Sequence, residues 1–322
     1  MSAYALKNRI AVITGGGSGI NLALTRQLLE AGCSVVVADV SLRPEAETAI
    51  DEYPHPASEA GRASAVFCKT DISDWTQITA SWETALEKFG RIDIVVNGAG
   101  IYEPPSSSFW NPPGISPLAQ DPEDAKVGQY KTFAVNTVGS IRLAQIAIDY
   151  WQQHPAVQGN LLWVASMGGY MHSMQTPLYF ASKAAIVSMV KSLAGLRKAL
   201  GIRNAAVCPA GVFTPIFEQE YCRDRLRPGD VALSPKDCAD LMMRVLQEPQ
   251  YGDGNIVEIM MVGTKEEQSI SVREVGLEAL YPTVRPIDQG TRAMAEELKF
   301  FEKVSKEGMR TGAGSTSQSE SK

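Results

Sequence analysis

The feature that most constrains the fold of this chain is an alternation of short apolar runs, rich in β-branched residues, with longer segments of helical apolar spacing. Short runs that are apolar almost throughout are typical of strands buried on both faces of a sheet. Parallel strands of this kind are joined by helices that cover the sheet. The alternation therefore predicts an α/β fold, a doubly wound parallel sheet of about seven strands with flanking helices. The runs span residues 9–14, 34–39, 65–68, 92–97, 160–165, 204–208 and 255–261.

The chain of 322 residues divides into three predicted parts. Residues 1–262 form the main domain, and residues 263–310 form a C-terminal extension with an amphipathic helix near 291–306. The last part, residues 311–322, reads TGAGSTSQSESK and is predicted to be disordered. Two long loops follow strand carboxyl ends, one at 101–125 and one after the sixth run. Because ligands of open α/β sheets bind outside those ends, we expect both loops to form walls of the substrate site.

Composition and charge exclude several classes of protein. The formal net charge is −6, and lysines and arginines do not cluster, whereas nucleic-acid binding relies on many cations meeting phosphates. The five cysteines and three histidines lack the spacing of a metal site, so no metal is expected. No window of about 18 apolar residues predicts a membrane span. Neither a signal peptide nor an anchor is visible at the N-terminus, so we expect a cytoplasmic protein.

A glycine-rich segment connects the first predicted strand to a helix. It contains Gly15, Gly17, Ser18, Gly19 and Ile20. Glycines let the backbone approach a pyrophosphate closely, and the helix N-terminus offers free N–H groups, although such turns also occur for packing reasons.

An aspartate ends the second strand, roughly 20 residues further on, where a carboxylate can accept hydrogen bonds from the adenosine ribose. Asp39 disfavours a 2′-phosphate, so NAD is predicted over NADP, a preference that Arg43 would weaken if it folded back. The alternative interpretation of Asp39 is a solvated loop aspartate.

Further small and polar residues follow the third and fourth strands. Asp71 and Ile72 are suited to hold an adenine, and Asn97, Gly98 and Ala99 stand where a cofactor must pass. Each could equally be turn chemistry, since Asn, Gly and Asp dominate turns. Their order along the chain favours the cofactor interpretation.

A tyrosine and a lysine four residues apart carry the chemical prediction. Tyr179 and Lys183 share one face of a predicted helix, and a nearby cation is expected to lower the pKa of the phenol towards the working pH. Ser166 follows the fifth strand, where its hydroxyl can bind a substrate oxygen. Asn136 is a polar residue amid apolar ones, and a structural hydrogen bond is its alternative interpretation.

Taken in order, TGGGSGI, Asp39, Asp71, NGAG, Asn136, Ser166, YFASK and PAGVFT resemble the short-chain dehydrogenase/reductase family over residues 8–262. The resemblance implies a Rossmann-type fold with NAD as cofactor. It further implies that Tyr179 transfers the proton, Lys183 holds the nicotinamide ribose, Ser166 orients the substrate and Asn136 steadies a relay water. Pro209, Val212 and Thr214 of PAGVFT complete the implied cofactor site. Asp39 and the extended C-terminal segment are similar to the 15-hydroxyprostaglandin dehydrogenase-like branch.

Three residues depart from the family pattern. The pattern has glycine where Asn21 stands, NNAG reads NGAG with Gly98 in second place, and the PG after the sixth strand reads Pro209-Ala210. Asn21 is expected to crowd the first helix near the pyrophosphate, which predicts weaker cofactor affinity or a local rearrangement.

These observations predict an NAD(H)-dependent oxidoreductase that interconverts a lipophilic secondary alcohol and its ketone. Two rivals remain, a non-catalytic NAD-binding sensor or scaffold and a methyltransferase on the same kind of sheet. Apolar helices at 129–151 and 179–200 predict a homodimer or homotetramer. The lipophilic prediction rests on aromatic and methionine residues in the loops, namely Tyr102, Phe109, Trp110, Met167, Met171, Met174, Phe213 and Phe217.

Overall fold

The computed structural model describes residues 2–59, 61–276 and 288–310. Within these ranges the chain forms a sheet of eight strands in the order β3-β2-β1-β4-β5-β6-β7-β8. The first seven strands are parallel, which confirms the predicted α/β fold. The strand order reverses between β1 and β4, so the switch point lies between them. The strands are β1 (Ile10–Thr14), β2 (Ser34–Asp39), β3 (Ala65–Lys69), β4 (Ile94–Asn97), β5 (Asn160–Val164), β6 (Arg203–Pro209), β7 (Asp253–Gly263) and β8 (Gln268–Glu274).

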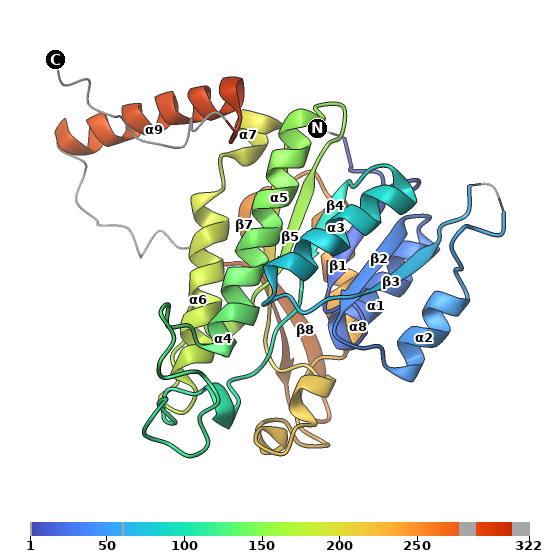
Figure 1. Ribbon diagram of the computed structural model, residues 1–322. Coiled ribbons are helices and arrows are strands. Elements are labelled where there is room, and N and C mark those ends of the chain that lie inside the picture. The colour runs from blue at the N-terminus through green and yellow to red at the C-terminus, as the bar shows by residue number, and fades with distance from the viewer. Residues whose placement is uncertain (1, 60, 277–287, 311–322) are drawn as a thin grey trace.

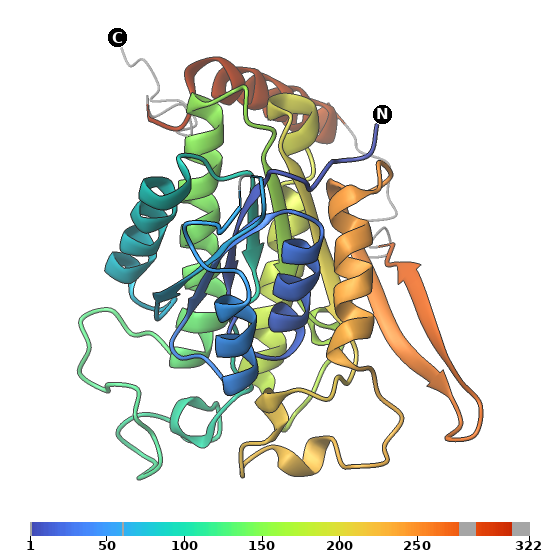
Figure 2. The same cartoon turned by 90° about the vertical axis from the view of Figure 1, so that its right-hand side faces the viewer.

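Helices cover both faces of the sheet (Figures 1 and 2). One face packs against α1 (Gly19–Glu30) and α8 (Pro235–Gln247). The other packs against α3 (Trp75–Phe89), α5 (Ser140–Gln153) and α6 (Pro177–Ser192). Burial on both faces explains why the central strands are apolar almost throughout. The shorter helices are α2 (Pro44–Asp51), α4 (Lys131–Phe133) and α7 (Leu196–Leu200), and a π-helical segment at Ala134–Gly139 joins α4 to α5.

Local sequence signals define several helix ends. The Asp74 carboxylate accepts hydrogen bonds from the backbone N–H groups of Thr76 and Gln77 at the start of α3. Gly90 ends the same helix in the left-handed conformation, with φ of 72°. Ser234 and Asp237 form a reciprocal capping box at the start of α8. These contacts hold helices whose apolar faces then pack on the sheet.

The sheet continues beyond residue 262, into the segment that was predicted as an extension. Strand β8 pairs with β7 in the antiparallel sense, so the predicted boundary falls inside a hairpin of the main sheet. The helix expected near 291–306 is α9 (Asp288–Glu307), which lies beside α7 (Figure 1). There the Ser305 hydroxyl donates a hydrogen bond of 2.9 Å to the Ala199 carbonyl. The predicted disordered segment 311–322 lies outside the described residues. None of the described helices is long and apolar enough to cross a membrane.

Both long loops lie at the carboxyl end of the sheet. In both views the loop between β4 and α4 and the loop between β6 and α8 sit at the same end of the molecule, away from α9 (Figures 1 and 2). This end is where an open parallel sheet exposes the ends of its strands.

Candidate active site

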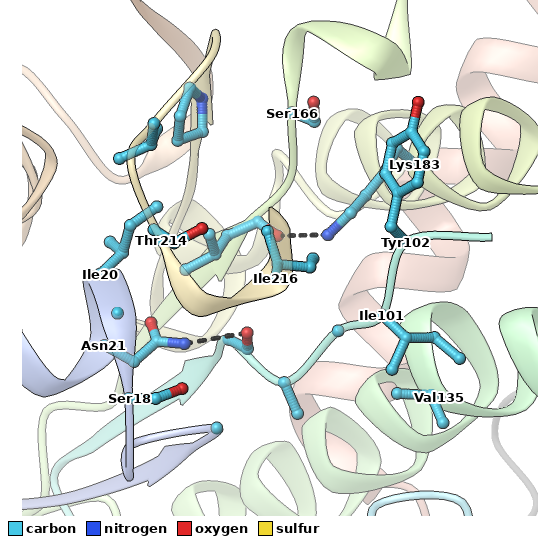
Figure 3. Close-up of a pocket in the computed structure, with 18 of the residues that line it drawn as sticks. Ser18, Ile20, Asn21, Ile101, Tyr102, Val135, Ser166, Lys183, Thr214 and Ile216 are labelled. Carbon is cyan, nitrogen blue, oxygen red and sulfur yellow. Dashed lines mark hydrogen bonds between the residues drawn. The ribbon is translucent and has the colours of Figure 1, made fainter. Parts of the chain in front are cut away.

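A cavity of about 540 Å³ lies at the carboxyl ends of the strands, beside the switch point. Ser18 and Asn21 lie on one side and Ser166 and Lys183 on the other, with the loop that carries Thr214 between them (Figure 3). The volume is within the usual range for a small-molecule site, about 300–1,000 Å³. The structure brings together along this cavity most of the predicted site residues: Gly15, Ser18, Gly19, Ile20, Asp39, Asp71, Ile72, Gly98, Ala99, Ser166, Tyr179, Lys183, Pro209, Val212 and Thr214.

The glycine-rich turn fits the close approach of a phosphate group. Gly15 and Gly19 have φ of 69° and 54°, which side chains rarely adopt. A Cβ on Gly17 would lie 2.5 Å from the Ser41 carbonyl oxygen, so that position also requires glycine. Helix α1 follows directly, and among the described residues none caps its N-terminus with a side chain. Free N–H groups and the positive end of the helix dipole therefore face the cavity.

Asp39 supports this turn and faces the cavity. Its carboxylate accepts hydrogen bonds from the backbone N–H groups of Gly17, at 2.8 Å, and Ser41, at 3.4 Å. Arg43 turns away towards the loop after β6, where its guanidinium donates to the Glu218 carboxylate at 2.8 and 2.9 Å. The Asp39 carboxylate, rather than Arg43, thus sets the charge at the end of the cavity beside the glycine-rich turn.

Gly17, Asn97 and Asn136 lie behind the cavity lining. The Asn136 amide donates to the Ile101 carbonyl and to the Ser182 hydroxyl, each at 3.0 Å, and accepts from the Ile101 N–H. Within the part of the chain that is described, the buried side-chain amide of Asn97 has no hydrogen-bond partner. Asn136 holds the loop after β4 against α6, and its part in a proton relay stays a prediction.

Tyr179, Ser166 and Lys183 converge at the inner part of the cavity. Tyr179 and Lys183 are one turn apart on α6, and Lys183 Nζ is 6.0 Å from the centre of the Tyr179 ring. Lys183 Nζ donates to the Val164 carbonyl at 3.0 Å (Figure 3). Ser166, two residues after β5 ends, also lines the cavity, and its hydroxyl accepts a hydrogen bond of 3.0 Å from the Gly168 N–H. A hydroxyl, a phenol and an amine therefore line the same cavity.

The prediction of a lowered pKa for Tyr179 is wrong. Burial raises the pKa of Tyr179 to about 12, although the nearby Ser166 side chain opposes this rise. Burial also lowers the pKa of Lys183 to about 8. The cost of desolvating the phenolate exceeds the help of its neighbours, because the lysine is itself desolvated and turned to a carbonyl.

One carboxylate in the site was not predicted. Glu103 is 3% exposed, and its Oε2 accepts a hydrogen bond of 2.9 Å from the backbone N–H of Tyr179. Its Oε1 accepts from the Ser108 hydroxyl and the Phe109 N–H, both at 2.9 Å. Glu103 thus ties the loop after β4 to the first turn of α6. The available hint was that α6 begins Thr-Pro, a start that leaves an early N–H group in need of an acceptor.

The predicted apolar residues divide into two groups. Tyr102, Met167, Met171 and Phe217 line the cavity, and the Tyr102 ring packs 4.7 Å from the Tyr179 ring. The other four do not line this cavity, which corrects their prediction as residues of this pocket, although Phe213 lines a second cavity that shares Thr214 and Phe217 with the first. These four side chains are exposed on the surface of the loops: Phe109, Trp110, Met174 and Phe213. Among the described residues, no group of His, Cys, Asp or Glu could hold a metal ion.

The sheet, the turn at its switch point and the residues beside Tyr179 are those of an oxidoreductase that uses a nicotinamide cofactor. A family model described as short chain dehydrogenase matches residues 9–224, and the chain belongs to that family.

Known relatives agree with this assignment. An L-fucose dehydrogenase of Bos taurus is 26% identical over 66% of this chain and 68% of its own. A 15-hydroxyprostaglandin dehydrogenase [NAD(+)] of Homo sapiens is 28% identical over 66% of this chain and 71% of its own. The structure of a 3-ketoacyl-(acyl-carrier-protein) reductase from Brucella melitensis, complexed with NADH, is 26% identical, covers 79% of this chain and 98% of that one, and has a TM-score of 0.62.

Proposed function

We propose that this protein is an NAD(H)-dependent enzyme that interconverts a lipophilic secondary alcohol and its ketone, with Tyr179 as the acid/base. The observation that carries the proposal is the shared cavity, which Tyr179, Ser166 and Lys183 line together with Asp39 and the glycine-rich turn. The groups suited to proton transfer therefore face the same space as those suited to hold a dinucleotide.

The choice of NAD over NADP rests on charge at the adenosine end. The Asp39 carboxylate can accept hydrogen bonds from ribose hydroxyls and repels a 2′-phosphate. Arg43, the nearby cation, is engaged by Glu218. A human relative whose name specifies NAD(+) and a neighbour solved with NADH support the same choice.

In the proposed reaction the bound dinucleotide supplies the hydride chemistry. Ser166 donates a hydrogen bond to the substrate oxygen and holds it beside the phenol of Tyr179. Tyr179 gives a proton to that oxygen in reduction and removes one in oxidation. Lys183 contributes positive charge on the same helix face, 6.0 Å from the centre of the Tyr179 ring.

The lipophilic substrate class rests on the side chains around Tyr179. Tyr102, Met167, Met171 and Phe217 present aromatic and thioether surface to the cavity. An apolar lining with few polar groups favours burial of a hydrocarbon skeleton. A sugar, as the name of the fucose dehydrogenase relative would suggest, needs more hydrogen-bonding partners than these side chains offer.

A cytoplasmic homodimer or homotetramer that assembles through α5 and α6 completes the proposal.

The test is a fluorescence titration with NADH and NADPH, followed by assays with lipophilic secondary alcohols, ketones and L-fucose. We expect NADH to bind more tightly than NADPH, and Tyr179→Phe to abolish turnover without loss of NADH binding. Tyr53→Phe, a change between α2 and β3 at a residue that does not line the cavity, is the matched control. Binding without turnover on any substrate would favour the non-catalytic sensor or scaffold, and binding of a methyl donor in place of the nucleotides would favour the methyltransferase.

A further inference from the structure

The side chain of Asn21 connects two segments that border the cofactor cavity. Asn21 is the third residue of α1 and is 6% exposed. Its Nδ2 donates a hydrogen bond of 2.9 Å to the Gly98 carbonyl, beyond the end of β4 (Figure 3). Because β1 and β4 flank the switch point, this bond links the first turn of α1 to the loop across it.

The position of this amide depends on the absence of a side chain at residue 98. A Cβ on Gly98 would lie 2.3 Å from Asn21 Nδ2 and 2.4 Å from Asn21 Oδ1. Both distances are far below a van der Waals contact, so Asn21 fills the space that a side chain at position 98 would need. A side chain at position 98 would therefore displace the Asn21 amide from this position and disrupt its bond with the Gly98 carbonyl.

The two positions also depart from the family pattern in opposite directions. The pattern has glycine at position 21 and asparagine at position 98, and this chain has Asn21 and Gly98. We infer that these departures are one exchange, in which Asn21 supplies the amide from α1 and positions the loop after β4 for the dinucleotide. This inference rests on the proposed function, since it assigns the pair to cofactor binding.

The contacts around Gly98 support a positioning role. Thr14 Oγ1, at the end of β1, accepts hydrogen bonds from the N–H groups of Gly98, at 3.0 Å, and Ala99, at 3.2 Å. Gly98 is thus held at its N–H by β1 and at its carbonyl by Asn21. Both Gly98 and Ala99 line the cavity, so their placement determines the shape that a dinucleotide meets.

The side-chain amide of Asn21 combines one favourable hydrogen bond with one buried oxygen that lacks a partner among the described residues. This combination distinguishes a role in positioning the loop from a role in stabilising the fold. Asn21 Oδ1 is buried, and the described residues give it no hydrogen-bond partner. A buried acceptor without a partner destabilises a fold, which offsets the benefit of the bond from Nδ2. Removal of the amide should therefore change stability little, while the loop that it holds becomes free to move.

The test is a double-mutant cycle of Asn21→Gly, Gly98→Asn and the combined variant, with the Kd for NADH and the free energy of unfolding measured for each. We expect each single change to weaken NADH binding by about tenfold and the combined variant to return to within about threefold of the wild type. Gly98→Ala, alone and with Asn21→Gly, examines the same contact with a smaller side chain. We expect Gly98→Ala to weaken NADH binding when Asn21 is present, and to cause no further loss of binding when it is added to Asn21→Gly.

A combined variant that binds NADH no better than the weaker single variant overturns the exchange, as do single variants that all bind like the wild type. A wild type that binds no nicotinamide dinucleotide overturns the proposed function and the positioning role. In that case the free energy of unfolding tests whether the two departures form one exchange. The exchange requires the combined variant to have a higher free energy of unfolding than Gly98→Asn.

Discussion

Burial shifts the pKa of two ionisable side chains on α6, Tyr179 and Lys183. Tyr179, with a pKa of about 12, stays protonated at neutral pH. Lys183, with a pKa of about 8, loses its positive charge as the pH rises from about 7 to about 9. Reduction needs the phenol as donor, whereas oxidation needs the phenolate as acceptor. A protonated Tyr179 suits ketone reduction, whereas alcohol oxidation depends on deprotonation of Tyr179.

The different protonation states that the two reactions need predict opposite pH responses for alcohol oxidation and ketone reduction. A raised tyrosine pKa means that the phenolate becomes more abundant as pH rises, so kcat/KM for alcohol oxidation should increase from about pH 6 to about pH 8. Above the pKa of Lys183, about 8, loss of the ammonium charge should flatten this rise and slow ketone reduction. Lys183→Arg keeps the charge and should remove that break. An oxidation rate that falls between about pH 6 and pH 8 would contradict the assignment of Tyr179 as base.

Glu103 positions the tyrosine through its backbone. Glu103→Ala removes the acceptor for the Tyr179 N–H and for two groups of the loop after β4. We expect kcat/KM to fall by about tenfold or more, since a displacement of about 1 Å at a reacting group is costly. The Kd for NADH should change less than about twofold, because Glu103 does not line the cavity and the Gly98–Ala99 end of the loop is held separately by Asn21 and Thr14.

Glu103→Gln keeps one acceptor oxygen and should recover part of the kcat that Glu103→Ala loses. If Glu103→Ala acted only by impairing folding, the remaining acceptor would not be expected to restore kcat. Glu123→Ala, at an exposed carboxylate of the same loop, is the control and should leave kcat unchanged. Equal kinetics for Glu103→Ala and the wild type would exclude the positioning role.

At the scale of elements, the N-terminus of α2 is joined to the loop after β6. Arg43 precedes α2, and its backbone N–H donates to the Gly17 carbonyl at 3.3 Å, so Arg43 lies next to the glycine-rich turn. Glu218 directs that guanidinium away. An arginine in this region can bind a 2′-phosphate when it is free to do so.

Release of Arg43 should therefore relax cofactor selectivity. We expect Glu218→Gln to lower the Kd for NADPH by roughly three- to tenfold while the Kd for NADH stays within about twofold. Arg43→Ala combined with Glu218→Gln should cancel the gain. If titrations show both nucleotides shifting together, the ion pair orders the loop and does not select the cofactor.

Elements also differ in how far the sequence determined them. The parallel strands and Ser166 were predictable because apolar runs mark buried strands, and residues that follow such runs gather at one edge of the sheet. Strand β8 was missed because it carries mostly exposed residues and is defined by its backbone pairing with β7. The Asn21–Gly98 contact and the bond from Tyr179 to Glu103 depend on how loops distant in sequence fold together, which spacing along the chain does not encode.

The whole molecule separates function and stability between the two ends of its sheet. The carboxyl ends carry the cavity, while the amino ends of β1 and β4 are joined by a fully buried carboxylate, Asp93. Asp93 accepts hydrogen bonds from Arg9 Nη1, at 2.7 Å, the Ile10 N–H, at 3.0 Å, and Arg91 Nε, at 3.0 Å. These contacts connect the N-terminal segment to the centre of the sheet.

Asp93→Ala should therefore reduce stability without a change in cofactor binding. It leaves the buried Ile10 N–H without its acceptor and removes charge-assisted bonds to two partly exposed arginines, so it should lower the free energy of unfolding by about 1–3 kcal/mol. Urea unfolding measures this loss, and NADH titration well below the transition should give a Kd within about twofold of the wild type. Asp240→Ala, which removes an exposed pair with Lys236, should cost no more than about 1 kcal/mol. A large change in Kd for folded Asp93→Ala would show that the amino end of the sheet also shapes the cavity, because the variant alters no residue that lines it.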